Sequence, residues 1–462
     1  MKRYLLTLLA ALSLSAASAQ TPKYIFYFIG DGMGLGPVMS AMNYKRMVHP
    51  EQPPMVMTGF PVVSFCQTYS ASTPVTDSAA AGTALSTGHK TKNTMLGMDA
   101  DTVSVTSVAR VLKDDGWGVG VLTTVAPDDA TPGAFYAHVP ARSQYYDIDI
   151  QAANSGYDFL AGSSWRGAID KEGNPTDVMD VFARNGYKVA YGSDGLKTIK
   201  GSEKVVLLGN PETNLNSNNI GYTIDSVPGT VTLPEMTRAA LDHLVRVSPD
   251  RFFMMVEGGN IDHALHGNDG GAAVKEIINF NDALRVAYDF YLRHPDETLI
   301  VVTADHDTGG MTIINPRGAK GGLENIQWQR ISKEEFSEFC KSLLRTRMVY
   351  RWEDMHDYLA DKLGFFTHIK ISEEQENRLK ELFDKTFEMR NSADQKTLYA
   401  SFNEFAVEVF GMFSEATGLG FTTTSHSGTP VPVFAVGVGA ERFKSFNNNI
   451  EIPATILDLV NE

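Results

Sequence analysis

Cysteine is scarce in this chain, which has only Cys66 and Cys340 among 462 residues. Two cysteines cannot supply the several cross-links that hold a small secreted disulfide scaffold together. They lie far apart in the sequence, and lone buried thiols are common in protein cores. We therefore expect both thiols to stay unpaired, although an exported chain could pair them. Stability must come from a hydrophobic core, and a chain with 43% hydrophobic residues can build a large one.

Positive charge is also in short supply. The chain has 40 lysine and arginine residues against 55 aspartate and glutamate residues, a formal net charge of −15. Binding to nucleic acid needs basic patches, so we expect no nucleic-acid partner. Small anionic ligands are not excluded, because metal ions and an arginine can make one site locally positive.

Beyond the N-terminus, the chain has no run of ~20 apolar residues that could span a membrane. The run from Leu5 to Leu14 follows two basic residues and precedes Ala17-Ser18-Ala19. This pattern predicts a signal peptide over residues 1–19, and the run is shorter than the ~20 residues that a membrane span needs. We therefore expect a domain over residues 20–462 that is exported, periplasmic or secreted, with no membrane span.

Apolar runs alternate with helical patterns along the chain. The runs predict buried strands at Lys23–Ile29, Arg251–Val256, Thr298–Thr303 and Val433–Val438. The helical patterns cover residues 103–113, 233–247 and 272–292. This alternation predicts an α/β fold, with a large, mostly parallel sheet flanked by helices on both faces.

Candidate ligand residues follow the ends of these strands. Asp31, Glu257, Asp305 and His306 all lie at or just past such an end. In parallel sheets ligands gather at the carboxyl ends of strands, so we expect these side chains to meet at one edge.

A segment from about residue 318 to 420 differs from the rest, because helical patterns dominate it. Capping patterns precede apolar helical faces near Ser332 and Ser372, and 403–413 continues the series. This predicts a helical insert. It could cap a site or mediate dimer contacts, but a packed satellite subdomain is the interpretation we favour.

Ser78 stands before a run of alanine and glycine, residues 79–84. If that run is a short helix, Ser78 lies at its amino end, where free N–H groups and the helix dipole favour an anion. The alternative is that Ser78 is an ordinary N-cap of a buried helix.

Six segments, in order, resemble those of the metal-dependent alkaline phosphatases. They are FIGDGMG (28–34), TDSAAAGTALSTG (76–88), DATPGAFYAHVPAR (129–142), VEGGNIDHALH (256–266), VTADHDTGG (302–310) and TSHSG (424–428). The resemblance implies the alkaline phosphatase fold and an enzyme that hydrolyses phosphate monoesters through a phosphoserine intermediate. It also implies two zinc ions and one magnesium ion as cofactors.

The resemblance assigns these ions to particular residues. It implies Asp262, His266 and His426 for one zinc ion, Asp31, Asp305 and His306 for the other, and Asp31, Thr131 and Glu257 for magnesium, with Asp129 acting through water. Aspartate and histidine suit zinc, and oxygen ligands suit magnesium.

The resemblance also implies the residues that handle the phosphate. Ser78 would be the nucleophile, Arg142 would grip two phosphate oxygens, and Asp77 would orient Arg142. His263 stands where many bacterial relatives carry lysine and animal relatives carry histidine. At position 129 the chain instead carries aspartate, as those bacterial relatives do, where animal relatives carry histidine. A neutral His263 would hold phosphate less tightly than lysine, so we expect weaker inhibition by free phosphate.

Three other functions compete with this interpretation. A sulfatase needs a C/S-x-P-x-R motif, but Ser78 is followed by alanines, and related diesterases usually use threonine. An exported binding protein without turnover would lack the nucleophile or one metal site, and both are present. The natural substrate and a homodimer remain open.

Overall fold

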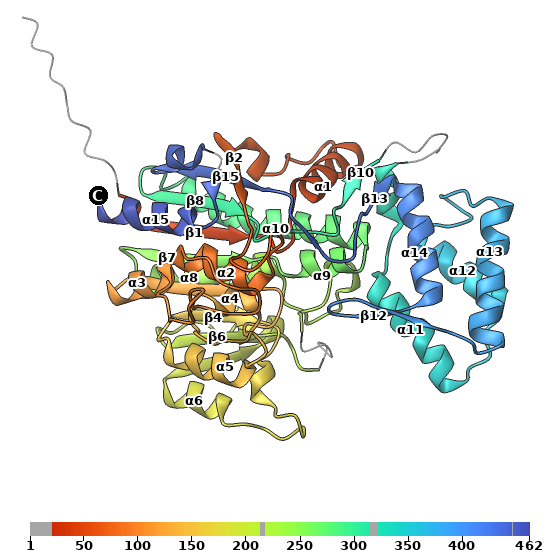
Figure 1. The fold of residues 1–462 in the computed structure, drawn as a ribbon, viewed down its shortest axis with the longest axis horizontal. Helices are drawn as coiled ribbons and strands as arrows, with labels where there is room; N and C mark the ends of the chain where they lie inside the picture. Colours follow the sequence, from red (N-terminus) through yellow and green to blue (C-terminus); the bar gives the residue numbers. More distant parts are fainter. Residues whose placement is uncertain (1–20, 213–217, 315–321, 446) are drawn as a thin grey trace, which may run out of the picture.

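The computed structural model describes residues 21–212, 218–314, 322–445 and 447–462. The predicted signal peptide lies outside these residues. The centre of the fold is a ten-stranded sheet (Figure 1). Its strands, from one edge to the other, are β16 (Asn447–Asn448), β2 (Val62–Gln67), β15 (Val431–Gly437), β8 (Thr298–Thr303), β1 (Tyr24–Ile29), β7 (Phe252–Glu257), β3 (Gly118–Thr123), β4 (Phe159–Gly162), β6 (Lys204–Leu208) and β5 (Tyr187–Tyr191).

Among the described strands of this sheet, only β15 runs antiparallel to its neighbours, β8 and β2. The register aligns the carboxyl ends of the three central strands. Ile29 of β1 pairs with Glu257 of β7 on one side and with Thr303 of β8 on the other. The loops that leave β1 and β8 therefore start beside each other, which brings Asp31 and Asp305 to one edge.

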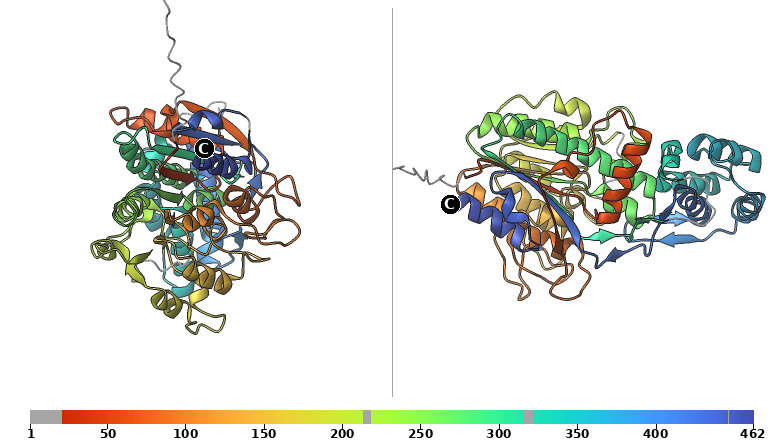
Figure 2. Two further views of the ribbon diagram at one scale, coloured as in Figure 1. Left: turned by 90° about the vertical axis from the view of Figure 1, so that its left-hand side faces the viewer. Right: turned by 90° about the horizontal axis from the view of Figure 1, so that it is seen from above.

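Helices cover both faces of the sheet (Figure 2). One face carries α1 (Leu35–Val48), α8 (Leu233–Val247) and α10 (Gly270–Tyr291), and the other carries α2 (Ser78–Thr87), α3 (Val108–Asp114) and α15 (Glu451–Asn461). The predicted α/β class is thus confirmed. The helix predicted over 103–113 begins only at Val108, because the Ser107 hydroxyl accepts a hydrogen bond from the Arg110 N–H at 3.1 Å and caps it.

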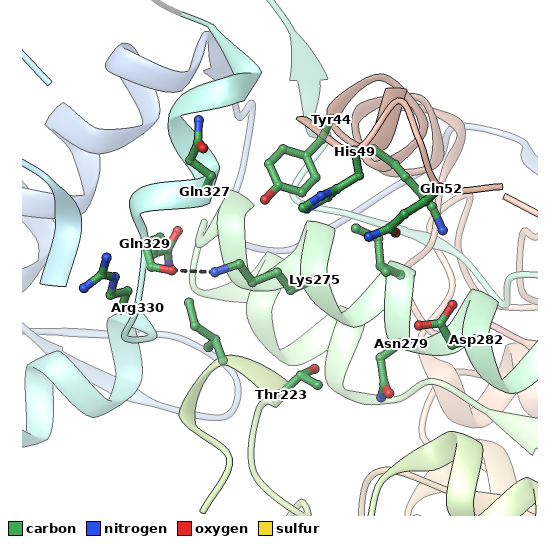
Figure 3. Close-up of a pocket in the computed structure, with 13 residues that line it drawn as sticks. Tyr44, His49, Gln52, Thr223, Lys275, Asn279, Asp282, Gln327, Gln329 and Arg330 are labelled. Carbon is green, nitrogen blue, oxygen red and sulfur yellow. Dashed lines mark hydrogen bonds between the residues drawn. The ribbon is translucent and has the colours of Figure 1, made fainter. Parts of the chain in front are cut away.

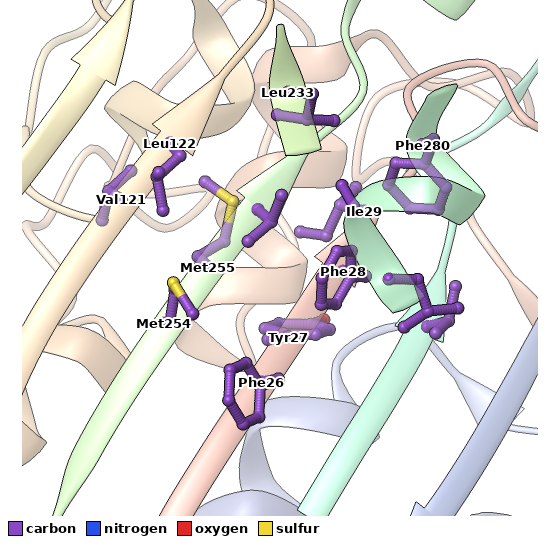
Figure 4. Packing of buried hydrophobic residues seen from close by; sticks show 14 of the residues in the cluster. Phe26, Tyr27, Phe28, Ile29, Val121, Leu122, Leu233, Met254, Met255 and Phe280 are labelled. Carbon is purple, nitrogen blue, oxygen red and sulfur yellow. The ribbon is translucent and has the colours of Figure 1, made fainter. Parts of the chain in front are cut away.

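The core explains why the central strands are apolar along their whole length. The side chains of Phe26, Tyr27 and Phe28 on β1 are all fully buried, because helices cover both faces (Figure 4). The Phe28 ring meets Phe280 of α10 edge to face at 5.6 Å. Fully burying such a side chain stabilises the fold by about 1.5–3 kcal/mol.

A helical insert lies beyond the carboxyl ends of β1 and β8 (Figure 1). We use this name for α11 (Lys333–Thr346), α12 (Trp352–Leu363), the hairpin strands β11 (Asp394–Lys396) and β12 (Ser401–Asn403), and the helices α13 (Glu373–Phe383) and α14 (Glu404–Thr417). Ser332 and Ser372 cap α11 and α13, as their sequence patterns predict. The sequence patterns did not predict α12.

The insert has a hydrophobic cluster of its own. The cluster contains Phe336, Leu359, Leu379 and Phe405, all fully buried, together with Cys340. Cys340 and Cys66 are both buried and free. In the described ranges, no helix combines the length and the apolar character needed to cross a membrane.

Candidate active site

Ser78 is the first residue of α2, and Asp77 caps that helix. The Asp77 Oδ1 atom accepts a hydrogen bond from the Ala80 N–H at 2.9 Å. The alternative in which Ser78 is the N-cap is therefore wrong. The Ser78 hydroxyl is buried and lies 3.1 Å from Nε2 of His306. The hydroxyl therefore lies within hydrogen-bonding distance of a histidine at the carboxyl edge of the sheet.

The rings of His266 and His426 face each other through their Nε2 atoms. The Nδ1 of His266 lies 2.6 Å from the Thr424 carbonyl, and the Nδ1 of His426 lies 2.8 Å from the Thr76 carbonyl. A carbonyl only accepts, so each Nδ1 carries the proton, and in a neutral ring Nε2 then presents a lone pair. The two Nε2 atoms are 3.1 Å apart. With both rings neutral, two lone pairs face each other at this distance, which suits binding of a metal cation.

The same accounting applies to His306. The Thr308 hydroxyl donates to Asp262 and therefore accepts from Nδ1 of His306 at 3.1 Å. The Nε2 lone pair of His306 then faces carboxylate oxygens of Asp31 at 3.4 Å and Asp305 at 3.2 Å. Burial lowers the pKa of His306 well below its ordinary value, which keeps this ring neutral. A metal ion would convert these three repelling acceptors into ligands.

Buried carboxylates at this edge also lack donors. Asp31 Oδ1, Asp262 Oδ2 and Glu257 Oε1 are buried without a hydrogen-bond partner. Burial raises the pKa of Asp31 well above its ordinary value, that of Glu257 to about 8 and that of Asp305 to about 6. Burying a carboxylate without a partner costs folding free energy, so these oxygens are suited to bind cations.

The ligand atoms form two overlapping groups. Asp262, His266 and His426 form one, and Asp31, Asp262 and His306 form the other; within each group the atoms lie within 4.8 Å of one another. Asp262 and His266 share a face of α9 (Asn260–His266) because they are four residues apart. Asp262 belongs to both groups, which the sequence did not indicate.

The predicted magnesium ligands lie next to these groups. Thr131 approaches Asp305, with Oγ1 3.5 Å from Oδ2, and it also interacts with Glu257. The Thr123 hydroxyl donates a hydrogen bond to Oε2 of Glu257. An oxygen-rich set of this kind suits magnesium.

Two arginines converge on Asp129. Nη2 of Arg142 lies 2.6 Å from Asp129 Oδ1, and Nη1 of Arg166 lies 3.3 Å from Oδ2. Burial opposes ionisation, but Arg166 and Arg142 together hold the pKa of Asp129 below its ordinary range. Asp77, predicted to orient Arg142, is the more distant partner at 3.8 Å. Arg166 was not predicted from the sequence, because it lies outside the six motif segments.

His263 and Tyr399 complete this side of the site. Burial lowers the pKa of His263 to about 4, so the ring is neutral at physiological and alkaline pH. The ring of Tyr399 packs on it, with centroids 3.9 Å apart. Tyr399 comes from the helical insert, and no sequence motif marked it.

A separate cavity of about 540 Å³ lies between α1, α10 and the segment that leads into the insert (Figure 3). Lys275 and Arg330 are among its lining residues, and Lys275 donates to the Gln329 carbonyl. It contains none of the predicted site residues.

Comparisons with known proteins agree with this geometry. A family model described as alkaline phosphatase matches residues 22–161 and 164–461. Alkaline phosphatase 3 of Bacillus subtilis (strain 168) is 30% identical over 477 residues, covering 97% of this chain and 93% of that relative. The tissue-nonspecific alkaline phosphatase of Homo sapiens is 30% identical over 365 residues, covering 68% of each chain. The crystal structure of a cold-active alkaline phosphatase from Shewanella sp. superposes with a TM-score of 0.78 at 25% identity, covering 95% of this chain and all of that one (100%).

Proposed function

Because this chain belongs to the alkaline phosphatase family and is a metal-dependent phosphomonoesterase, we propose that it works through a phosphoserine formed on Ser78. We further propose that two zinc ions and one magnesium ion serve it. The observation that carries the proposal is the proton accounting around Ser78. The imidazoles of His266, His306 and His426 direct their Nε2 atoms at carboxylates or at each other, beside the serine hydroxyl.

The chemical type of each ligand group indicates which ion it would bind. Asp262, His266 and His426 would hold one zinc ion, and Asp31, Asp305 and His306 the other. Glu257 and Thr131, with Asp31 shared and Asp129 acting through water, would hold magnesium. When bound, the ions lower the pKa of the Ser78 hydroxyl and offset charge on the attacking and leaving oxygens.

The chain's own residues carry the two displacements. The Ser78 oxygen forms a bond to phosphorus while the ester P–O bond breaks and the alcohol leaves with a proton. Water then attacks phosphorus, the bond to Ser78 breaks, and the serine oxygen regains a proton. Arg142, held by Asp129, offers a planar fork to two phosphate oxygens throughout.

The N-terminal pattern completes the proposal. We propose that residues 1–19 direct export to the periplasm or the medium and are removed, and that residues 20–462 act as the enzyme, with a helical insert from about 318 to 420. Small phosphate monoesters are the proposed substrates.

Steady-state hydrolysis of chromogenic substrates tests the proposal. The purified mature chain would be given a phosphate monoester, a matched diester and a matched sulfate, with zinc plus magnesium and after chelation. We expect strong turnover of the monoester that chelation abolishes. Preference for the diester or the sulfate would contradict the proposed substrate class, and absence of turnover with metals bound would favour a binding protein.

A further inference from the structure

Tyr399 brings the helical insert into the active site. It lies on the loop between β11 and β12, which points from the insert back toward the sheet (Figure 1). Its ring packs on His263 and meets His266 edge to face at 5.3 Å. Its hydroxyl accepts a hydrogen bond from Nη2 of Arg142 at 3.4 Å. One side chain of the insert thus contacts a predicted zinc ligand and two predicted phosphate-binding residues.

The hairpin that carries Tyr399 is anchored to the insert's first helix. The N–H of Asn403 on β12 donates to the Ser337 hydroxyl at 2.7 Å, and Lys341 donates to the Ser401 carbonyl. Phe402 is buried, and the Lys333 ammonium lies 4.8 Å above its ring. The position of Tyr399 therefore follows from packing on α11.

The hydroxyl of Tyr399 keeps a proton to donate. It accepts from Arg142, and in the part of the chain that the structure describes its own proton has no acceptor. The phenol thus lies next to the guanidinium that would hold the phosphate.

We propose that Tyr399 is a positioning residue for the phosphate group: it orients Arg142 through its hydroxyl, and its ring holds His263 in place. The helical insert therefore helps to set the affinity for phosphate. This inference rests on the proposed function, because it takes Arg142 as the residue that grips the phosphate.

Two variants of the zinc- and magnesium-loaded enzyme separate the hydroxyl from the ring. Tyr399→Phe keeps the ring on His263 and loses the contact with Arg142. We expect KM for a chromogenic monoester and the inhibition constant for inorganic phosphate to rise about three- to tenfold, with kcat within about twofold. Tyr399→Ala loses both contacts and should raise both constants about tenfold or more. Leu398→Ala changes the exposed neighbour on the same loop and should match the wild type.

The outcomes distinguish this inference from the proposed function. A wild type that does not hydrolyse the monoester would overturn the proposed function. An active wild type with unchanged KM and phosphate inhibition in both Tyr399 variants would overturn the inference alone. A fall in kcat and melting temperature without a change in KM would show that Tyr399 only supports the fold, and would overturn the inference as well.

Discussion

The carboxyl edge of the sheet and the core of the helical insert are both buried, but they are built from opposite materials. The edge gathers carboxylates and imidazoles from across the chain, from Asp31 to His426, and several of the carboxylate oxygens lack hydrogen-bond donors. The insert core gathers apolar side chains from one stretch, residues 331–413.

This difference shows where the fold draws its stability. Burying an unpaired carboxylate destabilises a protein, whereas burying a side chain such as Phe336 stabilises it. The edge is therefore an arrangement that suits cations and chemistry, and the apolar packing elsewhere stabilises the fold. Changes at the edge should alter turnover, and changes in the insert core should alter stability.

The largest effect should come from the edge. Ser78→Ala removes the attacking oxygen, so we expect kcat to fall by at least about 1,000-fold. Metal content should stay unchanged, because the proposed ligands are other residues. Steady-state kinetics with metal analysis checks both. Normal activity in this variant would exclude Ser78 as the nucleophile.

The matching change in the insert core should act on stability instead. Phe336 is fully buried, so Phe336→Ala should lower the free energy of unfolding by about 3–5 kcal/mol in urea titrations. In the folded, metal-loaded enzyme we expect kcat to stay within about threefold of wild type. Phe336→Leu, which leaves a smaller cavity, is the control. A variant that loses turnover but keeps its stability would break the comparison.

Lys333 joins the two regions and gives a pH-dependent test. It donates to the Gly267 carbonyl at 2.9 Å, directly after α9. Burial lowers the pKa of Lys333 from 10.5 to about 8. In that window the unfolded chain binds more protons than the folded one, so the contribution of Lys333 to stability rises with pH.

We expect the wild type to gain about 3 kcal/mol over Lys333→Met across this window. Urea unfolding at several pH values measures the difference. Lys396→Met, on the exposed strand β11, should leave the shape of the pH curve unchanged. Parallel curves for wild type and Lys333→Met would contradict the shifted pKa.

The smallest effect concerns His263, where the edge meets the insert. Burial lowers its pKa to about 4, so the wild type has no charge there at working pH. His263→Lys should add a cation beside the phosphate and lower the inhibition constant for phosphate about tenfold. His263→Gln stays neutral and is the control. Equal inhibition of wild type and His263→Lys would show that this position does not sense the phosphate.

The sequence predicted the parts of the site that follow from local rules. Apolar runs that end in polar residues placed Asp31, Glu257 and Asp305 at one edge, because parallel strands in register end together. If the small-residue run after Ser78 formed a helix, Ser78 was expected at its amino end, and Ser78 is the first residue of α2.

The rest depends on contacts between distant segments. Tyr399 lies in a short hairpin loop without a periodic pattern, and only the packing of β12 on α11 carries it to His263. Arg166 follows a strand that lies outside the six motif segments. Its importance is visible only in the structure, where it forms ion pairs with both Asp128 and Asp129. Sequence patterns describe elements, and these contacts arise between elements.

The most direct test of the account is to trap the intermediate. The metal-loaded enzyme would be quenched in acid during turnover of a phosphate monoester and digested, and its peptides examined by mass spectrometry. The account predicts one added phosphoryl group on Ser78, and none in Ser78→Ala. Rapid turnover with an unmodified Ser78 peptide at every quench time, or a phosphoryl group on another residue, would contradict it.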